Sequence, residues 1–278
     1  MKKWLIIAGC LMAAGLIVFS VGLGIAGFDC RRWGTQNMVT NTHTIEEDFI
    51  SVRLNVLTAD ITFAPSEDGH VKVVCYEDSK IPNSVHVEGD TLVISTKDNR
   101  KWYDHIGFNW EENTITVYLP AGEYGDLCVD CTTGDVNVPE QFTFQNATLD
   151  LTTGDTQWKA GIGQDLSVKC TTGSVAVENV LCNSLKVKTT TGDVTLDRVQ
   201  AAETMAVTVS TGDVKLNRAD AGEIVIKATT GDVTGTLLSE KIFDTKVTTG
   251  DVTVPASATG GTCRVTTTTG NIDLKIAD

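Results

Sequence analysis

The chain has 278 residues, enough for one or two domains, and only 6% of them are aromatic. Its formal net charge is −14, with 36 acidic residues against 22 basic ones. This balance argues against nucleic-acid binding, which depends on patches of lysine and arginine that contact phosphate.

The N-terminal segment predicts a membrane anchor. Residues 4–28 contain no charged side chain and are long enough to cross a bilayer. Lys2 and Lys3 precede this run, which favours a cytoplasmic N-terminus with the rest of the chain outside, although two arginines just beyond the run weaken that orientation. We therefore predict a single-pass anchor within residues 1–28. A cleaved signal peptide and lipidation at Cys10 are the alternatives.

The next part of the chain lacks a strict repeat. Residues 29–44 are polar and mixed in charge, which predicts a juxtamembrane linker. Residues 45–125 contain several short alternating stretches that predict strands, and one of them resembles a degenerate repeat corner with Ala59 at the glycine position. Solenoids need atypical terminal coils to cover the open end of their core, so we interpret residues 45–125 as an N-terminal cap.

Residues 126–278 repeat one Thr-Gly-Asp-type motif eight times. Apolar and polar residues alternate ahead of each motif, which is typical of a half-buried strand, and two apolar positions follow it. Successive motif glycines are separated by 20, 19, 19, 20, 19, 19 and 20 residues. These glycines are Gly134, Gly154, Gly173, Gly192, Gly212, Gly231, Gly250 and Gly270.

The motif itself predicts a corner between two strands. Glycine adopts unusual dihedral angles at low steric cost, and aspartate can bond to nearby backbone. We expect the threonine directly before each glycine to face inward, so that one extra residue separates the inward positions and bends the chain. A near-constant period of this size indicates stacked repeats. The predicted fold is an all-β, single-stranded β-helix-like solenoid with coils of 19–20 residues, stacked about 4.8 Å apart.

The far end of the repeat has no evident cap. The chain stops at Asp278, half a coil after Gly270, so we expect the last coil to form the open C-terminal end of the solenoid. Exposed strand edges are a liability unless charges or a partner cover them. Asp273 and Lys275 are candidates to block this edge, and self-association through the open C-terminal coil is the alternative.

The aspartates that follow the corner glycines would form a ladder along one edge of the solenoid. They could bind Ca²⁺, as carboxylates do in other β-helix repeats, but one carboxylate per coil is sparse for an ion that takes six to eight oxygen ligands. Ser174 and Asn271 replace aspartate in two coils, which fits a turn-forming role. We therefore expect no metal and no cofactor. The ladder comprises Asp135, Asp155, Asp193, Asp213, Asp232 and Asp251.

A second ladder lies two residues before the glycines and is predicted to face outward. A flat array of threonines can match a repetitive ligand such as ice or a glycan, whereas the alternative is cross-strand pairing on a solvated sheet. Interleaved lysines, Lys169, Lys188, Lys227 and Lys246, break the flatness of this face. The outward ladder comprises Thr132, Thr152, Thr171, Thr190, Ser210, Thr229, Thr248 and Thr268.

Two further groups are candidate binding residues. Residues 101–110 contain Trp102 and Trp110 on the least repeat-like stretch beyond the anchor, and such aromatic side chains can stack on sugars or bury against a protein. Their alternative role is to cover the first coil. Arg198 and Arg218 both fall six residues after a glycine and should lie on neighbouring coils, either in a solvated turn or against an anionic ligand.

The eight cysteines and four histidines do not form a recognisable reactive centre. Cys131 and Cys170 share an inward register but lie two coils apart, about 9–10 Å, which is beyond the reach of a disulfide. We expect buried free thiols, and the cysteine spacings do not match a zinc site. No nucleophile elbow or phosphate loop is present. The chain is therefore predicted not to be an enzyme and to have no catalytic residues.

The serial Thr-Thr-Gly-Asp-Val units, taken with two other features of the sequence, resemble those of a bacterial protein family. These features are the N-terminal apolar run and the element Thr116-Val117-Tyr118-Leu119-Pro120. The family comprises β-strand-repeat proteins known as "putative adhesins", including LiaG-like membrane-anchored envelope proteins, and the similarity spans about residues 45–278.

This resemblance implies an adhesin-like binding or scaffold module of the bacterial cell envelope, anchored in the membrane with the solenoid outside. An envelope glycan or a membrane protein would be its partner. The alternative function is a regulatory or sensory partner of membrane proteins in envelope-stress signalling. The family has no established catalytic residues to carry over.

Overall fold

The computed structural model describes residues 37–97 and 112–277, together with five helical positions near the N-terminus: Met12, Gly15, Ile17, Ser20 and Val21. Within these residues, no helical segment has the length and hydropathy that a membrane crossing requires. Apart from the five helical positions, the predicted anchor at residues 4–28 lies outside the described residues, as does the aromatic stretch 101–110.

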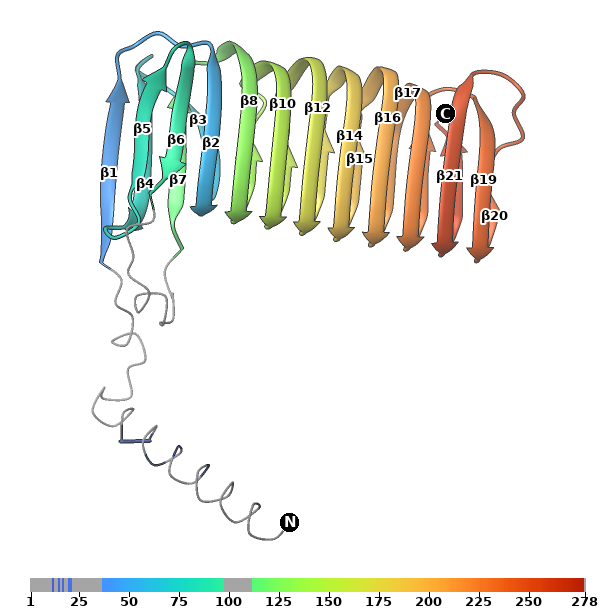
Figure 1. The fold of residues 1–278 in the computed structure, drawn as a ribbon. Coiled ribbons are helices and arrows are strands. Elements are labelled where there is room, and N and C mark those ends of the chain that lie inside the picture. Colours follow the sequence, from blue (N-terminus) through green and yellow to red (C-terminus); the bar gives the residue numbers. More distant parts are fainter. Residues whose placement is uncertain are drawn as a thin grey trace.

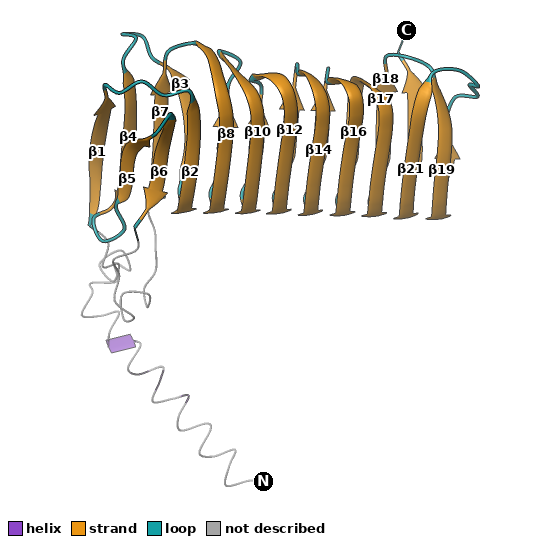
Figure 2. Ribbon diagram, turned by 45° about the horizontal axis from the view of Figure 1, so that its top comes forward, coloured by secondary structure: helices purple, strands orange, loops and turns teal. Residues whose placement is uncertain are grey.

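From residue 37 onward the described chain is all β, and its strands wind into a solenoid with two long faces (Figure 1, Figure 2). The predicted β-solenoid is therefore confirmed. We call the faces A and B. Strand β17 runs through both faces and joins them into one sheet of 22 strands.

Face A carries, in spatial order, β1 (Met38–Ile45), β4 (Val71–Asp78), β7 (Thr114–Leu119), β3 (Asp60–Pro65), β9 (Val136–Val138), β11 (Thr156–Trp158), β13 (Val175–Glu178), β15 (Val194–Asp197), β17 (Val214–Thr230), β18 (Val233–Leu237), β22 (Ile272–Ile276) and β20 (Val252–Thr253). Face B carries, in the same direction, β5 (Asn83–Glu88), β6 (Thr91–Thr96), β2 (Ser51–Thr58), β8 (Gly122–Thr133), β10 (Phe142–Thr153), β12 (Gly161–Thr172), β14 (Leu181–Thr191), β16 (Gln200–Thr211), β17, β21 (Gly261–Thr269) and β19 (Lys241–Thr249).

Alternation along the strands builds a narrow core in which like positions of successive coils stack. In β12, Leu166, Val168 and Cys170 are buried, whereas Lys169 between them is exposed. The same positions pair in register with the neighbouring strands, so each buried row continues from coil to coil. The core is held by the removal of these apolar rows from water, at about 25 cal/mol per Å².

The corner glycines pack backbone against backbone. In the eight repeats their φ angles lie between +136° and +143°, a region that favours glycine. A Cβ atom built on Gly192 would lie 2.0 Å from the carbonyl oxygen of Gly173 in the preceding coil. Ala59 occupies the first corner, as predicted, and its carbonyl oxygen takes the same place beneath Gly134. Ala59 is tolerated because it does not adopt the positive φ of the later corners.

The predicted inward direction of the threonine before each glycine is wrong. Thr133 and Thr132 are both exposed, and the last buried residue of β8 is Cys131. The same pattern recurs in the other repeats, where two consecutive exposed residues precede the glycine. The chain therefore begins to bend before the glycine. Two consecutive residues face outward there, and this pair is what shifts the alternation between inward and outward positions.

The N-terminal end of the solenoid is covered by antiparallel strands. Strand β1 pairs with β4, β4 pairs with β7, and β5 pairs with β6, all in antiparallel fashion. Strand β1 begins at Met38, within the segment predicted to be a linker. The carboxylate of Glu77 is buried and accepts bonds from the side chain of Asn41 and from the backbone and side chain of Asn83, which ties β1, β4 and β5 together.

The expectation that the last coil of the chain forms the open end is wrong. Strand β21 lies between β17 and β19, and β22 lies between β18 and β20. The final coil is therefore inserted inside the solenoid, and the coil made by β19 and β20 is outermost (Figure 1). Self-association through the open end would consequently involve β19, where Ile242 is 46% exposed, and β20, where Val252 is 43% exposed.

One buried lysine bridges the inserted coil. Lys241 of β19 is paired with Gly261 of β21, and its ammonium reaches past that glycine to the coil beyond. It donates to the carbonyl of Ala221 at 2.8 Å and to the hydroxyl of Ser239 at 2.9 Å, and it forms an ion pair with Asp220 at 2.5 Å. Gly261 has no room for a side chain, since its Cβ would lie 2.1 Å from the carbonyl oxygen of Gly222.

Replacing a corner glycine should strongly destabilise the solenoid. Gly192→Ala introduces both a positive-φ alanine and a clash with the backbone of the preceding coil, so we expect a loss of about 3 kcal/mol in the free energy of unfolding. Gly122→Ala is the control, because nothing lies within 4 Å of its added Cβ. Denaturant unfolding of the two variants measures the difference. Equal stabilities would contradict the close corner packing.

Removing the bridging lysine should loosen the outer coil. Lys241→Met leaves the carboxylate of Asp220 without its ion-pair partner, and we expect a loss of about 3 kcal/mol in the free energy of unfolding. Hydrogen exchange should rise first in β19 and β21, while β12 stays protected. The exposed Lys215→Met is the matched control. Uniform exchange across all strands would show that the lysine does not hold the end coil.

Candidate binding face

The outer surface of face B carries one row of side chains whose charge changes along the solenoid. We call it the lysine row. Its members lie four residues before the corner glycines and are neighbours in the strand register. In spatial order they are Asp130, Asp150, Lys169, Lys188, Thr208, Lys227, Thr266 and Lys246.

Three lysines of this row are free to bind a ligand. The ammonium of Lys169 pairs with Asp150 at 2.7 Å. In contrast, Lys188, Lys227 and Lys246 are exposed and make no ion pair or side-chain hydrogen bond with any described residue. Thr208 and Thr266 separate them in space. The free ammonium groups therefore recur every second coil, at intervals of about 9–10 Å.

Two rows of hydroxyl groups run beside the lysine row. The predicted outward ladder that includes Thr190 and Thr229 is exposed, as expected, and the threonines that follow it, such as Thr191 and Thr230, are exposed as well. Within the described chain, these four hydroxyls accept and donate no hydrogen bond. The face thus presents two adjacent rows of hydroxyl groups next to the lysines.

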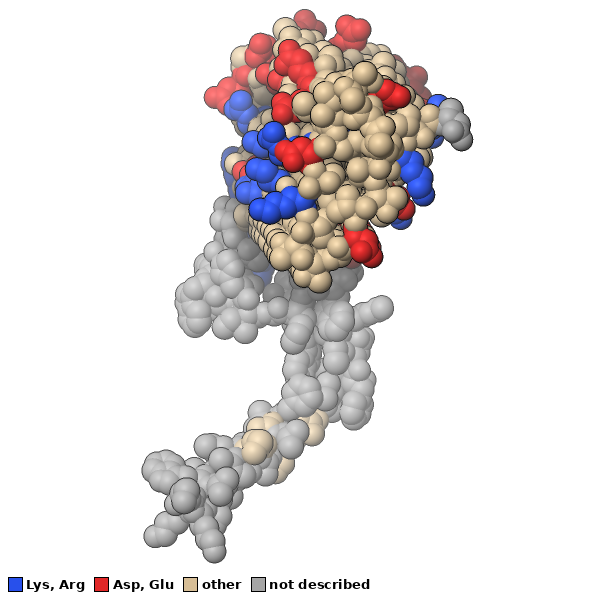
Figure 3. Space-filling view, turned by 90° about the vertical axis from the view of Figure 1, so that its right-hand side faces the viewer, with Lys and Arg blue, Asp and Glu red and all other residues tan. Residues whose placement is uncertain are grey.

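Charge is segregated around the solenoid. Figure 3 looks along the solenoid from the end that carries β19 and β20 and shows the larger group of blue side chains on one side, with acidic side chains above it, and a smaller blue group on the opposite side. On β14, β16, β17, β21 and β19, the positions four and six before the glycines carry five bases and one acid. The bases are Lys186, Lys188, Lys227, Lys246 and Arg264, and the acid, Asp244, pairs with Arg264 at 3.0 Å.

The aspartate ladder bonds to the protein itself. The carboxylate of Asp135 accepts the backbone N–H of Asp155 at 2.7 Å, and that of Asp213 accepts the N–H of Asp232 at 2.8 Å. Each such aspartate therefore bonds to the corner of the next coil, which is an inter-coil version of the predicted turn-forming role. No group of three or more acidic, histidine or cysteine side chains suited to a metal occurs among the described residues.

The two candidate arginines lie where the chain passes from face A to face B, Arg198 between β15 and β16 and Arg218 within β17. Arg198 and Arg218 adopt φ angles of 54° and 50°, as Asn179 does at 57° in the adjacent coil. The guanidinium of Arg198 pairs with Asp197 at 2.6 Å and donates to the side chain of Asn179 at 2.5 Å. Arg198 is therefore engaged by its own turn, which agrees with the solvated-turn interpretation.

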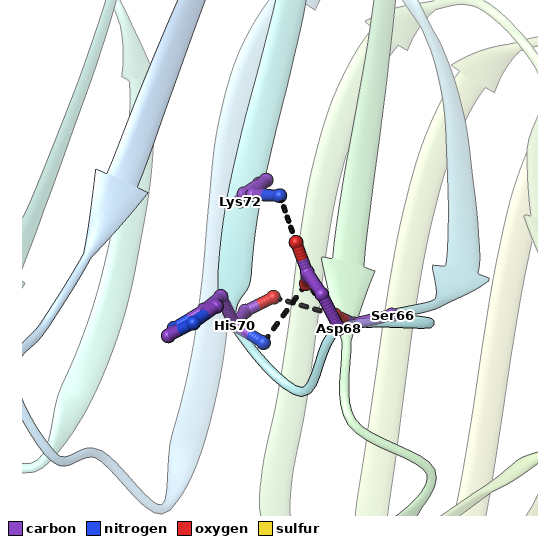
Figure 4. A network of polar contacts seen from close by, with 4 residues as sticks. All are labelled: Ser66, Asp68, His70 and Lys72. Atoms are coloured by element: carbon purple, nitrogen blue, oxygen red, sulfur yellow. Dashed lines mark hydrogen bonds and ion pairs between the residues drawn. The ribbon is translucent and has the colours of Figure 1, made fainter.

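A polar cluster in the loop between β3 and β4 contains a serine, an aspartate and a histidine (Figure 4). The carboxylate of Asp68 contacts the ammonium of Lys72 and accepts bonds from the hydroxyl of Ser66 and the backbone N–H of His70. These bonds hold the pKa of Asp68 well below its usual range. The imidazole of His70 points away from Ser66 and Asp68, so the three residues do not form a nucleophile and base.

The six described cysteines are free thiols, and five of them are buried, as predicted. Burial raises the pKa of Cys75 and Cys263 to about 12, and that of Cys131 and Cys182 to about 11. A thiol with such a pKa is protonated and unreactive at neutral pH. These cysteines therefore act as small apolar side chains of the core.

Taken together, the fold and the lysine row define a repetitive β-solenoid with a polar, solvent-exposed face. Residues 50–275 match the model of the Toastrack DUF4097 family, and the chain belongs to this family. A comparison with functionally curated proteins finds no match.

Solved structures share this fold at low sequence identity. A Bacteroides fragilis protein described as a "putative adhesin" has a TM-score of 0.55 and 16% identity, covering 87% of this chain and 99% of that one. A Parabacteroides distasonis protein described as a "putative lipid binding protein" has a TM-score of 0.51 and 13% identity, covering 87% of this chain and 98% of that one. At these identities the likeness establishes the fold alone.

The buried thiols predict a loss of stability at alkaline pH. In the unfolded chain a thiol ionises near its ordinary pKa of 9.0, whereas Cys75 and Cys263 ionise at about 12. Because the unfolded state releases these protons first, the free energy of unfolding should decrease as the pH rises from about 9 towards 12, and should be unaffected by thiols below that range. Denaturant titrations at several pH values measure this slope. Cys263→Ala should flatten it, and an unchanged slope would assign the loss to other groups.

Proposed function

We propose that the protein is a non-enzymatic binding module of the bacterial cell envelope, anchored through residues 4–28 and presenting the solenoid outside the cell membrane. The observation that carries this proposal is the exposed face B, where free ammonium groups and two hydroxyl rows recur in register with the coils. A surface repeated at the coil spacing suits a ligand that is itself repetitive, such as an envelope glycan.

The chemistry of the described residues supports binding rather than catalysis. The aspartates of the corners are used in bonds between coils, the buried thiols are protonated, and the Ser66 cluster lacks a base aimed at its hydroxyl. The descriptions of the structural neighbours, "putative adhesin" and "putative lipid binding protein", also name binding proteins. A regulatory partner of membrane proteins remains the competing function, and it would act through a protein contact.

Retention assays on the full-length chain in detergent separate these functions. The chain is immobilised and exposed in parallel to purified cell-wall polysaccharides and to solubilised membrane proteins of a Gram-positive and a Gram-negative bacterium. We expect a polysaccharide to be retained. Loss of retention in Lys188→Gln/Lys227→Gln/Lys246→Gln places the site on face B, whereas loss in Trp102→Ala/Trp110→Ala places it on the aromatic segment.

The contrary outcomes are distinct. Retention of one membrane protein, without any polysaccharide, would replace the binding-module function with the regulatory one. Failure to retain any envelope polymer would remove the proposal. The melting curve of the lysine variant should match that of the parent chain, since its three lysines are exposed and make no described contact. A lowered melting temperature in Trp102→Ala/Trp110→Ala would assign the tryptophans to covering the first coil.

A further inference from the structure

The spacing of the free lysines in the lysine row indicates a ligand class. We propose that the lysine row binds an acidic polysaccharide that lies along the solenoid axis and carries a carboxylate on every second sugar. This inference rests on the proposed function and specifies the chemistry of the polymer.

Charge complementarity is the first argument. The chain has a formal net charge of −14. On face B from β14 to β19, however, the positions four and six residues before the corner glycines hold five bases against the single acid Asp244. A neutral polymer would gain nothing from this segregation. An anionic polymer is attracted to the row and repelled by the acidic side chains above it in Figure 3, which favours binding along one line on the surface.

The interval between charges is the second argument. Lys188, Lys227 and Lys246 stand two coils apart, about 9–10 Å, with Thr208 and Thr266 in the coils between them. A polymer with an anion on every unit would place every second anion against a hydroxyl group. A polymer that alternates acidic and neutral sugars places its carboxylates against ammonium groups and its neutral sugars against threonines.

The hydroxyl rows supply the third argument. The hydroxyl groups of Thr190, Thr191, Thr229 and Thr230 belong to exposed residues and have no hydrogen-bond partner among the described residues. Hydroxyl groups both donate and accept, and so do the hydroxyls of a sugar. The rows can therefore follow a sugar chain along its length, whereas a chain of bare phosphodiesters would use only the donors.

The alternation exists because the final coil is inserted. In chain order the row reads Lys227, Lys246 and Thr266, which would place two lysines in neighbouring coils. The insertion of β21 between β17 and β19 places Thr266 between them and restores the two-coil interval. The spacing is therefore a property of the folded end of the solenoid.

The experiment measures binding of the full-length chain in detergent to four probes. Hyaluronan oligosaccharides carry a carboxylate on every second sugar, polygalacturonate carries one on every sugar, chitin oligosaccharides carry none, and poly(glycerol phosphate) carries a phosphodiester on every unit. We expect hyaluronan to bind most tightly, with an affinity that falls as salt is added, because exposed charge pairs are screened.

Two sets of variants test the row and its interval. Lys188→Gln/Lys227→Gln/Lys246→Gln should weaken hyaluronan binding about tenfold. Its control, Lys159→Gln/Lys215→Gln/Lys275→Gln, makes the same change in net charge away from face B, where Lys159 and Lys275 are paired with Glu178 and Asp273. It should leave binding unchanged. Lys227→Thr combined with Thr208→Lys keeps composition and net charge but moves one charge by a single coil. This variant should weaken binding of hyaluronan and spare that of polygalacturonate.

Several results would overturn the inference. Tighter binding of poly(glycerol phosphate) than of hyaluronan, lost in the face B triple variant, would assign a phosphate polymer to the row. Equal effects of the control and face B triple variants would show a nonspecific charge effect. Binding of chitin oligosaccharides alone would leave the proposed function standing and remove the acidic ligand. Binding of no probe, together with no retention of any envelope polymer, would remove both proposals.

Discussion

The contact between corner backbones is the constraint on which the solenoid depends. Each repeat glycine lies where an added Cβ would meet the carbonyl group of the neighbouring coil, at 1.9 to 2.2 Å across the eight repeats. Only a residue without a side chain can take this position. The positive φ of the position is a second, independent reason for glycine. The carboxylate of the next residue then accepts an N–H from the adjacent corner in most coils. Stacking distance and register are thereby set at one edge and transmitted along each strand.

A solenoid built in this way separates structure from recognition. The inward rows are filled by apolar side chains, and the corner aspartates are occupied by neighbouring backbone. Only the outward rows can vary without disturbing the stack, and they are repeated at the coil interval whatever residues occupy them. Ligand recognition by such a protein is therefore expected to depend on the sequence of side chains along a row, as in Lys188, Thr208 and Lys227, more than on any enclosed cavity.

Much of this arrangement could be predicted from sequence because the repeat imposes it. The glycine spacing and the alternation gave the solenoid, its corners and the inward cysteines. The outward direction of the Thr133 side chain could not be predicted, because alternation assumes a straight strand and the chain already bends at this residue. The order of the last two coils also escaped prediction, because β19 and β21 have equivalent repeat patterns and nothing local distinguishes an outer from an inner place. Gly260, Gly261 and the buried Lys241 were the available sequence signals for the inserted coil. Their role can be interpreted only once the coil that packs against them is known.

Both ends of the solenoid depart from chain order, and this links the fold to the binding face. At the N-terminal end, β2 lies between β6 and β8, and at the other end β21 lies between β17 and β19. An inserted coil has hydrogen-bonded neighbours on both sides, so the final strands of the chain are protected from fraying while an earlier coil carries the open edge. The same insertion determines which outward residues become neighbours. Lys246 therefore belongs to the lysine row at the two-coil interval only while Lys241, five residues earlier in the same strand, holds the outer coil across the inserted one. The integrity of this end and the spacing of charges on face B are consequences of one packing arrangement.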